Sequence, residues 1–174
     1  MSPINQRRLA IFKANKRGYY SLCIFATLFT LSLFAEFIAN DKPIVMAIDG
    51  DLFLPVWFSY SEEGIGGVME TEAEYLDPFV LDMIDKRGWA IWPMVRFSFD
   101  TIDWDLAPPY PHPPDAEHWL GTDGASTDVF AKLIYAFRLS VIFGFSLTII
   151  TSCLGIMVGA LQGYFGGLID LFGQ

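Results

Sequence analysis

The sequence contains only two cysteines, Cys23 and Cys153, and each falls inside a long apolar run. Two such cysteines provide no disulfide framework, and no Cys/His spacing typical of a zinc site accompanies them. The simplest interpretation is that both are small residues that face lipid or a neighbouring helix.

Sequence motifs of the common enzyme classes are also missing. The chain has no Gly-x-Ser-x-Gly, no His-Glu-x-x-His, no P-loop and no pair of carboxylates framed by an ordered pocket. We therefore predict no catalytic residue and no cofactor. If the protein serves an ATP-driven process, the missing P-loop means that another subunit hydrolyses the ATP.

A metal site is not predicted either. Asp100, Asp103 and Asp105 are closely spaced but lack the pattern of an EF-hand loop, so a solvated acidic face explains them better than calcium. His112 and His118 lie in a proline-rich segment without a third ligand at a telling spacing, which is not a zinc pattern.

Charge is distributed unevenly along the chain. Residues 1–18 hold five basic residues and no acid, whereas the segment from Asp41 to Lys132 holds 18 of the 20 acidic residues against five basic ones. The net charge of -9 therefore averages a basic tail and an acidic loop. The only basic cluster is short and adjoins an apolar run, which argues against a nucleic-acid-binding protein.

Charged residues are absent between Arg138 and Asp170, and the run 139–161 within this stretch is apolar enough to span a bilayer. A second apolar run covers 19–39, and its 21 residues would extend roughly 31 Å as a helix, the thickness of a hydrocarbon core. The run is long for a signal peptide and ends without a well-placed cleavage site, so we interpret it as an uncleaved span.

These runs predict an α-helical membrane protein with two transmembrane helices, 19–39 and 139–161. The basic tail, 1–18, is expected to stay in the cytoplasm, which places both termini inside (N-in, C-in). The segment 40–138 then forms a large periplasmic loop, and 162–174 begins a cytoplasmic part.

The loop is too apolar for disorder, and its local patterns predict a small α+β cap. Val45–Leu54 reads as a hairpin with a primed turn at Asp49-Gly50. A second extended piece is expected over 91–99, a helix within Glu70–Lys86 broken near Pro78, and polyproline II over Pro108–Pro114.

Small residues recur every four positions near the end of the second run, which on a helix places them along one face where another backbone can approach closely. Their number favours helix packing over the general abundance of glycine in membrane helices. This chain has too few spans to cover the face itself, so partner helices are predicted. The residues are Thr151, Gly155, Gly159, Gly163 and Gly167.

Two ordered motifs flank the second run and carry a family resemblance. The first runs from His118 to Ser140 and includes Leu120, Gly121, Thr122, Asp123 and Asp128; the second runs from Gly159 to Gly167. They resemble the dipeptide/oligopeptide ABC-transporter permeases of the C-subunit type. The N-terminal half, through 17–22, 39–43, 60–62 and Gly88-Trp89, is most similar to one branch, the Yej-type permeases of microcin C/peptide importers.

The resemblance implies a multi-pass permease subunit in the bacterial inner (plasma) membrane. It implies as partners a second permease subunit, cytoplasmic ABC ATPase subunits, a periplasmic solute-binding protein and a peptide substrate, in addition to membrane lipid. The spans would form part of a larger permease bundle that lines the translocation path.

The chain departs from the family pattern in two respects. Ser126 and Thr127 precede Asp128, where the family usually has Gly-Arg. Family permeases also continue with further helices beyond the position of Gln174, so the chain resembles the N-terminal part of a permease.

Two other functions remain as alternatives. A two-span membrane protein without transport activity would use its periplasmic domain to bind a partner or sense the envelope. A membrane-anchored enzyme that uses the acidic loop is the second alternative, and the missing catalytic constellation argues against it.

Overall fold

A computed structural model describes residues 3–165 of the chain. Internal contacts divide the chain into two compact units, Met1–Ala136 and Phe137–Gln174. The first unit contains three N-terminal helices and the cap, defined as residues 40–128. The second contains most of the long C-terminal helix.

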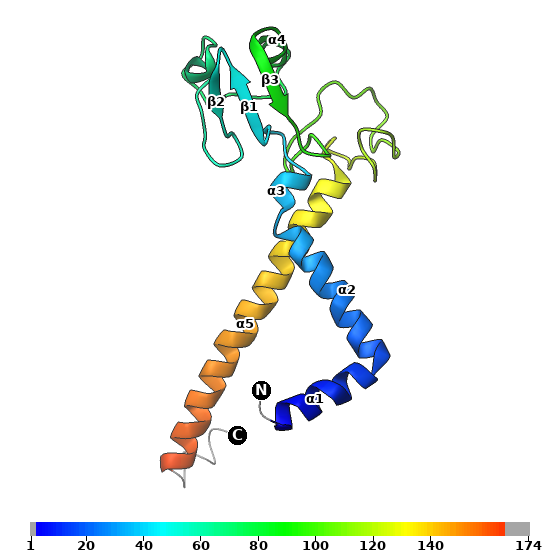
Figure 1. Cartoon of the computed structure of the whole chain (residues 1–174), viewed down its shortest axis with the longest axis vertical. Coiled ribbons are helices and arrows are strands. Elements are labelled where there is room, and N and C mark those ends of the chain that lie inside the picture. The colour runs from blue at the N-terminus through cyan, green and yellow to red at the C-terminus, as the bar shows by residue number, and fades with distance from the viewer. Residues whose placement is uncertain (1–2, 166–174) are drawn as a thin grey trace. The chain divides into compact units, whose positions relative to one another are not determined.

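The chain begins with three helices, α1 (Pro3–Ala14), α2 (Lys16–Ser32) and α3 (Ala35–Ile38) (Figure 1). Asn15 separates α1 from α2, and its side chain accepts a hydrogen bond from the backbone N–H of Gly18 at 3.3 Å, as an N-cap does. Most apolar side chains of α2 are exposed, so this helix does not contribute to a protein core.

The prediction of one continuous helix over 19–39 is wrong, because the helix is interrupted at Leu33-Phe34. The Ser32 hydroxyl donates to the carbonyl of Phe29 at 2.8 Å, and the N–H of Phe34 bonds three residues back to Leu31. Such bonds tighten the last turn and compete with the regular helical pattern. With 17 residues, α2 alone is roughly 25 Å long.

The cap contains a three-stranded antiparallel sheet in the order β2-β1-β3, formed by β1 (Val45–Ile48), β2 (Asp51–Phe53) and β3 (Gly88–Ile91). The predicted hairpin is confirmed: β1 and β2 pair across Asp49-Gly50, both with positive φ (53° and 96°), as a primed turn requires. The extended piece predicted over 91–99 is mostly wrong: β3 starts three residues before it and ends at Ile91, and 92–99 forms no strand.

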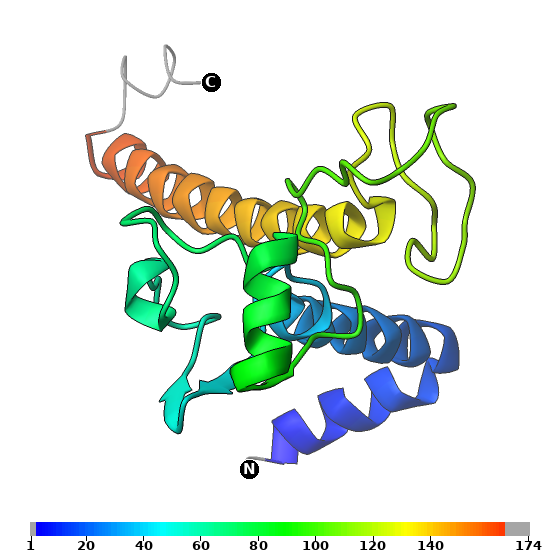
Figure 2. The ribbon, with the colours of Figure 1, turned by 90° about the horizontal axis from the view of Figure 1, so that it is seen from above.

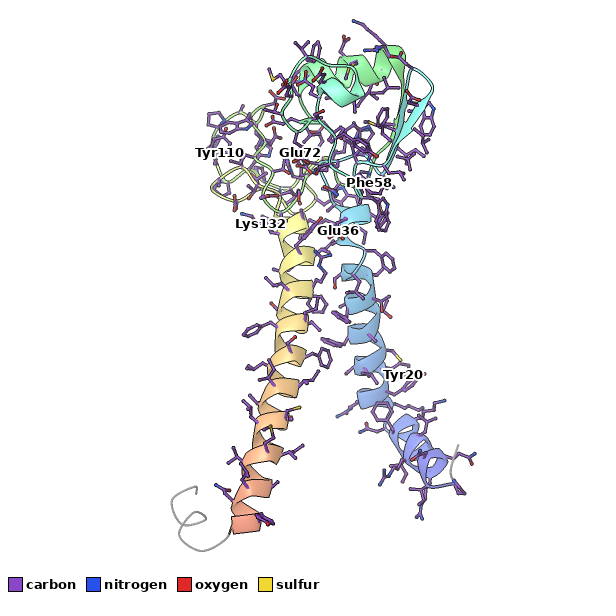
Figure 3. All side chains as sticks on the ribbon, turned by 90° about the vertical axis from the view of Figure 1, so that its left-hand side faces the viewer. Tyr20, Glu36, Phe58, Glu72, Tyr110 and Lys132 are labelled. Carbon is purple, nitrogen blue, oxygen red and sulfur yellow. The ribbon has the colours of Figure 1, made fainter. Side chains whose placement is uncertain are left out.

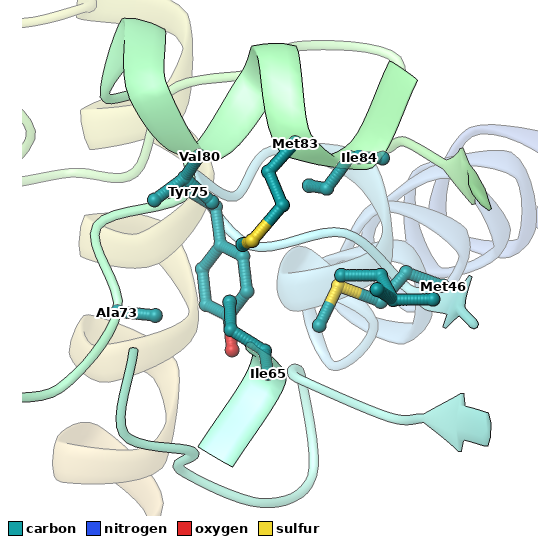
Figure 4. Packing of buried hydrophobic residues seen from close by; sticks show 8 residues of the cluster. Met46, Ile65, Ala73, Tyr75, Val80, Met83 and Ile84 are labelled. Carbon is teal, nitrogen blue, oxygen red and sulfur yellow. The ribbon is translucent and has the colours of Figure 1, made fainter. Parts of the chain in front are cut away.

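One face of this sheet supports the main hydrophobic core of the cap. Met46 and Ile48 of β1 belong to one buried cluster with residues of α4 (Pro78–Arg87) and of the short 3₁₀ helix η1 (Glu63–Ile65), and Figure 4 shows Tyr75, Val80 and Met83 on the same side as Met46. Helix α4 begins at Pro78, capped by the Asp77 carboxylate at 2.7 Å from the Phe79 N–H. The expected helix is therefore not broken at this proline but starts there, since proline suits the first turn.

The segment between β3 and the long helix forms a lobe of loops beside the sheet (Figures 1 and 2). The prediction of continuous polyproline II over Pro108–Pro114 is wrong. The chain bends there, and the Pro108-Pro109 and Tyr110-Pro111 peptide bonds are cis.

Helix α5 (Val129–Phe165) has 37 residues and starts ten residues before the apolar run 139–161. At about 1.5 Å per residue it is roughly 55 Å long, whereas a hydrocarbon core is about 30 Å thick. Its first two turns belong to the first unit, where Ala131 packs in a second buried cluster with Ala39 and Val95. The Tyr135 hydroxyl donates to the carbonyl of Ala39 at 3.1 Å.

Candidate functional site

A buried histidine lies between two carboxylates immediately before α5. His118 is fully buried; its Nδ1 lies 2.8 Å from Asp128 Oδ2 and its Nε2 lies 3.2 Å from Asp103 Oδ2. The ring stacks on Phe97, with 4.4 Å between the ring centroids. Asp103, His118 and Asp128 are called the His118 cluster below.

Both carboxylates accept hydrogen bonds only if both ring nitrogens donate, and this is the charged imidazolium form of His118. Burial alone lowers the pKa of His118, but the hydrogen bonds that the ring donates to Asp128 and Asp103 outweigh it and raise the pKa above its usual value. The cluster joins the 97–105 loop to the start of α5.

Asp128 also caps α5. Its Oδ1 accepts a hydrogen bond from the backbone N–H of Ala131 at 2.7 Å, and its carbonyl accepts the N–H of Lys132 at 3.1 Å. One carboxylate thus satisfies a free donor of the first helical turn and binds His118 with its other oxygen. The side chain is fully buried, so both bonds are shielded from water.

Gly121 and Thr122 fasten the proline-rich segment to this helix start. Two hydrogen bonds join Thr122 to the backbone of His112. The N–H of Thr122 donates to the carbonyl of His112 at 3.0 Å, and the N–H of His112 donates to Thr122 Oγ1 at 3.1 Å. Gly121 has a φ of +74°, and a Cβ there would lie 2.4 Å from the carbonyl oxygen of His112. The carbonyl of Gly121 accepts the N–H of Val129, the first residue of α5.

Asp123 closes the turn between these residues. Its carboxylate accepts a hydrogen bond from the Lys132 ammonium at 2.5 Å. It also accepts hydrogen bonds from the backbone N–H groups of Ala125 and Thr127, at 2.8 and 3.2 Å. The Lys132 bond, followed by the backbone bonds, lowers the pKa of Asp123 far below its usual value. Leu120, in contrast, has an exposed side chain.

The His118 cluster is expected to make the stability of the cap depend on pH. Because the folded-state pKa of His118 is raised, its contribution is complete below the unfolded value of about 6.5 and is lost as pH rises through the folded-state pKa. The midpoint of urea unfolding, followed by tryptophan fluorescence of the full chain in detergent, should therefore fall as pH is raised above about 6.5.

His118→Gln is the matched control for this titration, since it retains a polar side chain that does not ionise. Carboxylates with lowered pKa, such as Asp123, lose their contribution only at acid pH and do not enter this window. A pH slope that persists in His118→Gln would contradict the assignment.

The predicted helix-packing face lies on α5, far along the chain from this cluster. Thr151 donates to the carbonyl of Leu147 at 2.8 Å, and a Cβ built on Gly155, Gly159 or Gly163 meets nothing within 4 Å among the described residues. Gly167 lies outside the described residues. Cys23 and Cys153 are exposed, free thiols.

The acidic residues considered for calcium line one side of an open cleft of about 700 Å³ in the cap, between the 72–78 and 97–105 segments. Its lining includes eight carboxylates and one lysine, a charge balance that disfavours an anionic ligand. Within residues 3–165, no group of three or more His, Cys, Asp or Glu side chains is arranged to hold a metal ion.

The interaction of His118 with Asp103 and Asp128 was not predicted from the sequence. Asp128 is ten residues from His118 and Asp103 is fifteen residues before it, and neither spacing corresponds to a known local motif. The one feature of the sequence that connects them is that His118 and Asp128 lie within the same family motif.

The exposed apolar surface of the long helix α5 is typical of a membrane protein. Within the described residues, α5 is the one helix long and apolar enough to cross a membrane, and none of the 18-residue window that meets this test is buried. A helix that is apolar all round and uncovered by protein is suited to a bilayer.

Sequence similarity to known proteins shows which family of membrane proteins the chain belongs to. Over 174 residues, the whole of this chain and 51% of the relative, the sequence is 45% identical to the inner membrane ABC transporter permease protein YejE of Escherichia coli. It is 42% identical to the peptidoglycan transport system permease protein YejE of Agrobacterium fabrum, over 99% of this chain and 51% of the relative. A 58-residue stretch, 33% of this chain and 18% of the relative, is 41% identical to the dipeptide transport system permease protein DppC of Bacillus subtilis.

The chain belongs to the family of ABC-transporter permeases, and the resemblance noted in its sequence is confirmed. It is a protein of the bacterial inner membrane, and its relatives are transport components rather than enzymes. The chain spans about half the length of the first two relatives, 51% of each. No family model and no solved structure matches it.

Proposed function

We propose that the protein is part of an inner-membrane permease subunit of an ATP-driven importer for peptides and forms part of its translocation path. The observation that carries the proposal is the similarity to permeases over the whole chain, at 45% and 42% identity. The exposed apolar helix α5 supports it, since a subunit of a helical bundle presents such a surface to lipid and to partner helices.

The proposed topology has two spans. The basic tail, 1–18, lies in the cytoplasm, the first crossing covers 19–39 and includes α2 and α3, and 139–161 of α5 crosses back. The cap then lies in the periplasm, where a solute-binding protein delivers the substrate. Residues 162–174 begin the cytoplasmic part.

The proposed mechanism is alternating access without covalent chemistry in this subunit. ATP hydrolysis in separate cytoplasmic subunits rocks the permease bundle, and the spans of this chain form part of its wall. The His118 cluster fixes the first turn of α5 to the cap, so that a movement of the span is transmitted to the periplasmic surface as a rigid-body movement.

The proposed substrates are peptides. One relative is named an oligopeptide transport permease and another a dipeptide transport permease. The Agrobacterium fabrum relative, which matches 99% of this chain, is named for peptidoglycan transport. Peptidoglycan fragments that carry a peptide are therefore the second candidate substrate.

Uptake into cells tests the proposed function. A strain that lacks its other peptide importers should take up a labelled oligopeptide when the intact gene of this protein is present and lose this uptake when the gene is deleted. Unlabelled peptidoglycan fragments should compete if they share the path. Equal uptake with and without the gene would contradict the proposal.

Gly159→Leu should prevent assembly with the partner permease if the small-residue face packs against another helix, because a branched side chain holds the two backbones apart. We expect recovery of the partner subunit with the tagged protein to fall at least roughly tenfold, as a loss of about 1.4 kcal/mol implies. Met157→Leu is the control, since Met157 is exposed and lies two positions, or about 200°, around the helix.

The alternative of a two-span protein that only senses or binds predicts a different result. Such a protein would tolerate Gly159→Leu, and its cap would bind its partner when detached from the spans. Unchanged recovery of the partner permease with Gly159→Leu would contradict the packing face.

A further inference from the structure

Four aromatic side chains from two distant parts of the sequence gather at the end of the first apolar run. The rings of Phe34 and Phe37 lie 6.3 Å apart, and the ring of Phe37 lies 5.7 Å from that of Trp57, which comes from the loop after β2. Phe58 follows Trp57 in this loop, and its ring lies 6.5 Å from that of Tyr60; Figure 3 labels Phe58 and Glu36 of α3. Phe34, Phe37, Trp57 and Phe58 are called the outer aromatic belt.

Three of the four belt residues are exposed and Phe37 is half-buried, although the loop that carries Trp57 and Phe58 is well fixed. The exposed fractions are 54% for Phe34, 65% for Trp57 and 60% for Phe58. The N–H groups of Trp57 and Phe58 both donate to the carbonyl of Leu54 at 3.0 Å, and Pro55 is fully buried. The hydrogen bonds and the buried proline hold the aromatic rings outside the core.

A hydrophobic surface of this kind needs a covering partner. The segment from Leu52 to Ser61 contains no charged residue, so the loop offers no ion pair to a protein partner. Tryptophan and phenylalanine together suit the boundary between headgroups and hydrocarbon, where an apolar ring and an indole N–H are both satisfied.

The interruption of the helix at Leu33-Phe34 indicates the same depth. Lipid-exposed backbone without regular hydrogen bonding does not occur inside the hydrocarbon core, because its polar groups would have no partner. The N–H of Leu33 is shared between the carbonyls of Phe29 and Thr30, so the regular pattern ends here. The break therefore suits the boundary between hydrocarbon and headgroups, at the outer end of the proposed crossing.

The distance to the aromatic residues at the other end of the run agrees with this depth. Tyr19 and Tyr20 lie at the start of α2, with 5.9 Å between their ring centroids. From Tyr19 to Ser32, the last residue of α2, there are 32 − 19 = 13 residue steps, or roughly 20 Å at the helical rise, and the break and α3 extend the chain further toward the ~30 Å of a hydrocarbon core.

From these observations we infer that the outer aromatic belt is a lipid-binding surface, which seats the Leu54–Phe58 loop of the cap in the headgroup region of the outer leaflet. The inference rests on the proposed topology, because the belt is at this depth only if 19–39 crosses the membrane. The cap is thus held to the bilayer by its own loop as well as by the two spans.

Quenching of tryptophan emission by brominated lipid tests this surface. The full-length protein is reconstituted in phosphatidylcholine/phosphatidylglycerol vesicles whose acyl chains are brominated near the carbonyl end. Trp57→Phe should remove a quenched component, so that the quenched fraction of the remaining emission falls. Trp104→Phe is the matched control: Trp104 is 84% exposed in the 97–105 loop, and its loss should raise the quenched fraction.

The inference is overturned if the emission lost in Trp57→Phe is quenched no more than the emission lost in Trp104→Phe. Such a result would mean that water or a protein subunit, rather than lipid, covers the belt. Trp57→Phe keeps an aromatic ring beside Phe37, so the loop retains its contact.

Labelling of Cys23 separates this result from a failure of the topology. Cys23 lies exposed on α2, and in a Cys153→Ser background it is the one thiol left in the sequence. Protection of Cys23 from a membrane-impermeant maleimide, together with unquenched Trp57, contradicts the belt alone. Rapid labelling of Cys23 contradicts the first span, and with it both the belt and the proposed topology.

Discussion

Asp128→Ala is expected to lower the free energy of unfolding of the cap by about 3–5 kcal/mol. The substitution removes the N-cap of α5 and leaves His118 buried with one of its two carboxylate partners, and Asp128 and His118 are both fully buried. The effect is large because the buried imidazolium loses one of its two carboxylate partners and is not hydrated in exchange.

Urea unfolding of the full chain in detergent measures this effect. All five tryptophans lie between Trp57 and Trp119, so their fluorescence follows the cap rather than the membrane helices. Asp82→Ala is the control: Asp82 forms an exposed i,i+4 ion pair with Lys86 at 2.8 Å, and its loss should change stability by less than about 0.5 kcal/mol. Equal effects of the two substitutions would show that the His118 cluster is not a stabilising centre.

Gly121→Ala is expected to destabilise the cap by about 3 kcal/mol or more. The φ of +74° is unfavourable for alanine, and the added Cβ would lie 2.4 Å from the His112 carbonyl oxygen. That oxygen belongs to the backbone and accepts the Thr122 N–H, so it cannot move without loss of the bond. The same unfolding measurement detects the change.

Gly124 provides the control for this substitution within the same turn. A Cβ at Gly124 meets nothing within 4 Å, and Gly124→Ala should stay within about 0.5 kcal/mol of the unsubstituted protein. If the two alanine variants were equally stable, the proposed contact between the proline-rich segment and the start of α5 would be wrong.

Local patterns allowed several elements of the cap to be predicted. The Asp49-Gly50 pair between two apolar stretches encodes its hairpin almost completely, because few residues other than Gly, Asn and Asp adopt positive φ. The position of α4 was harder, since Pro78 is compatible with either a break or a first turn. The Asp77 side chain accepts a hydrogen bond from the Phe79 N–H and so caps the start of α4, which favours the first turn.

Contacts between distant residues were not predictable in this way. The interruption at Leu33-Phe34 depends on which carbonyls the backbone and Ser32 use, and apolar composition does not encode that choice. The His118 cluster brings together residues from 103 to 128 only after the loop has folded. Sequence alone therefore indicated that the motif matters for a family but not that a histidine is its centre.

The most direct test of the central claim is the composition of the complex that contains this protein. The intact gene is tagged in its natural chromosomal position, and the protein is extracted in mild detergent and purified under conditions that preserve membrane complexes. We expect a second permease subunit and an ABC ATPase of a peptide importer to copurify in stoichiometric amounts. Purification without any ATPase subunit, from cells that express the complete operon, would contradict the claim.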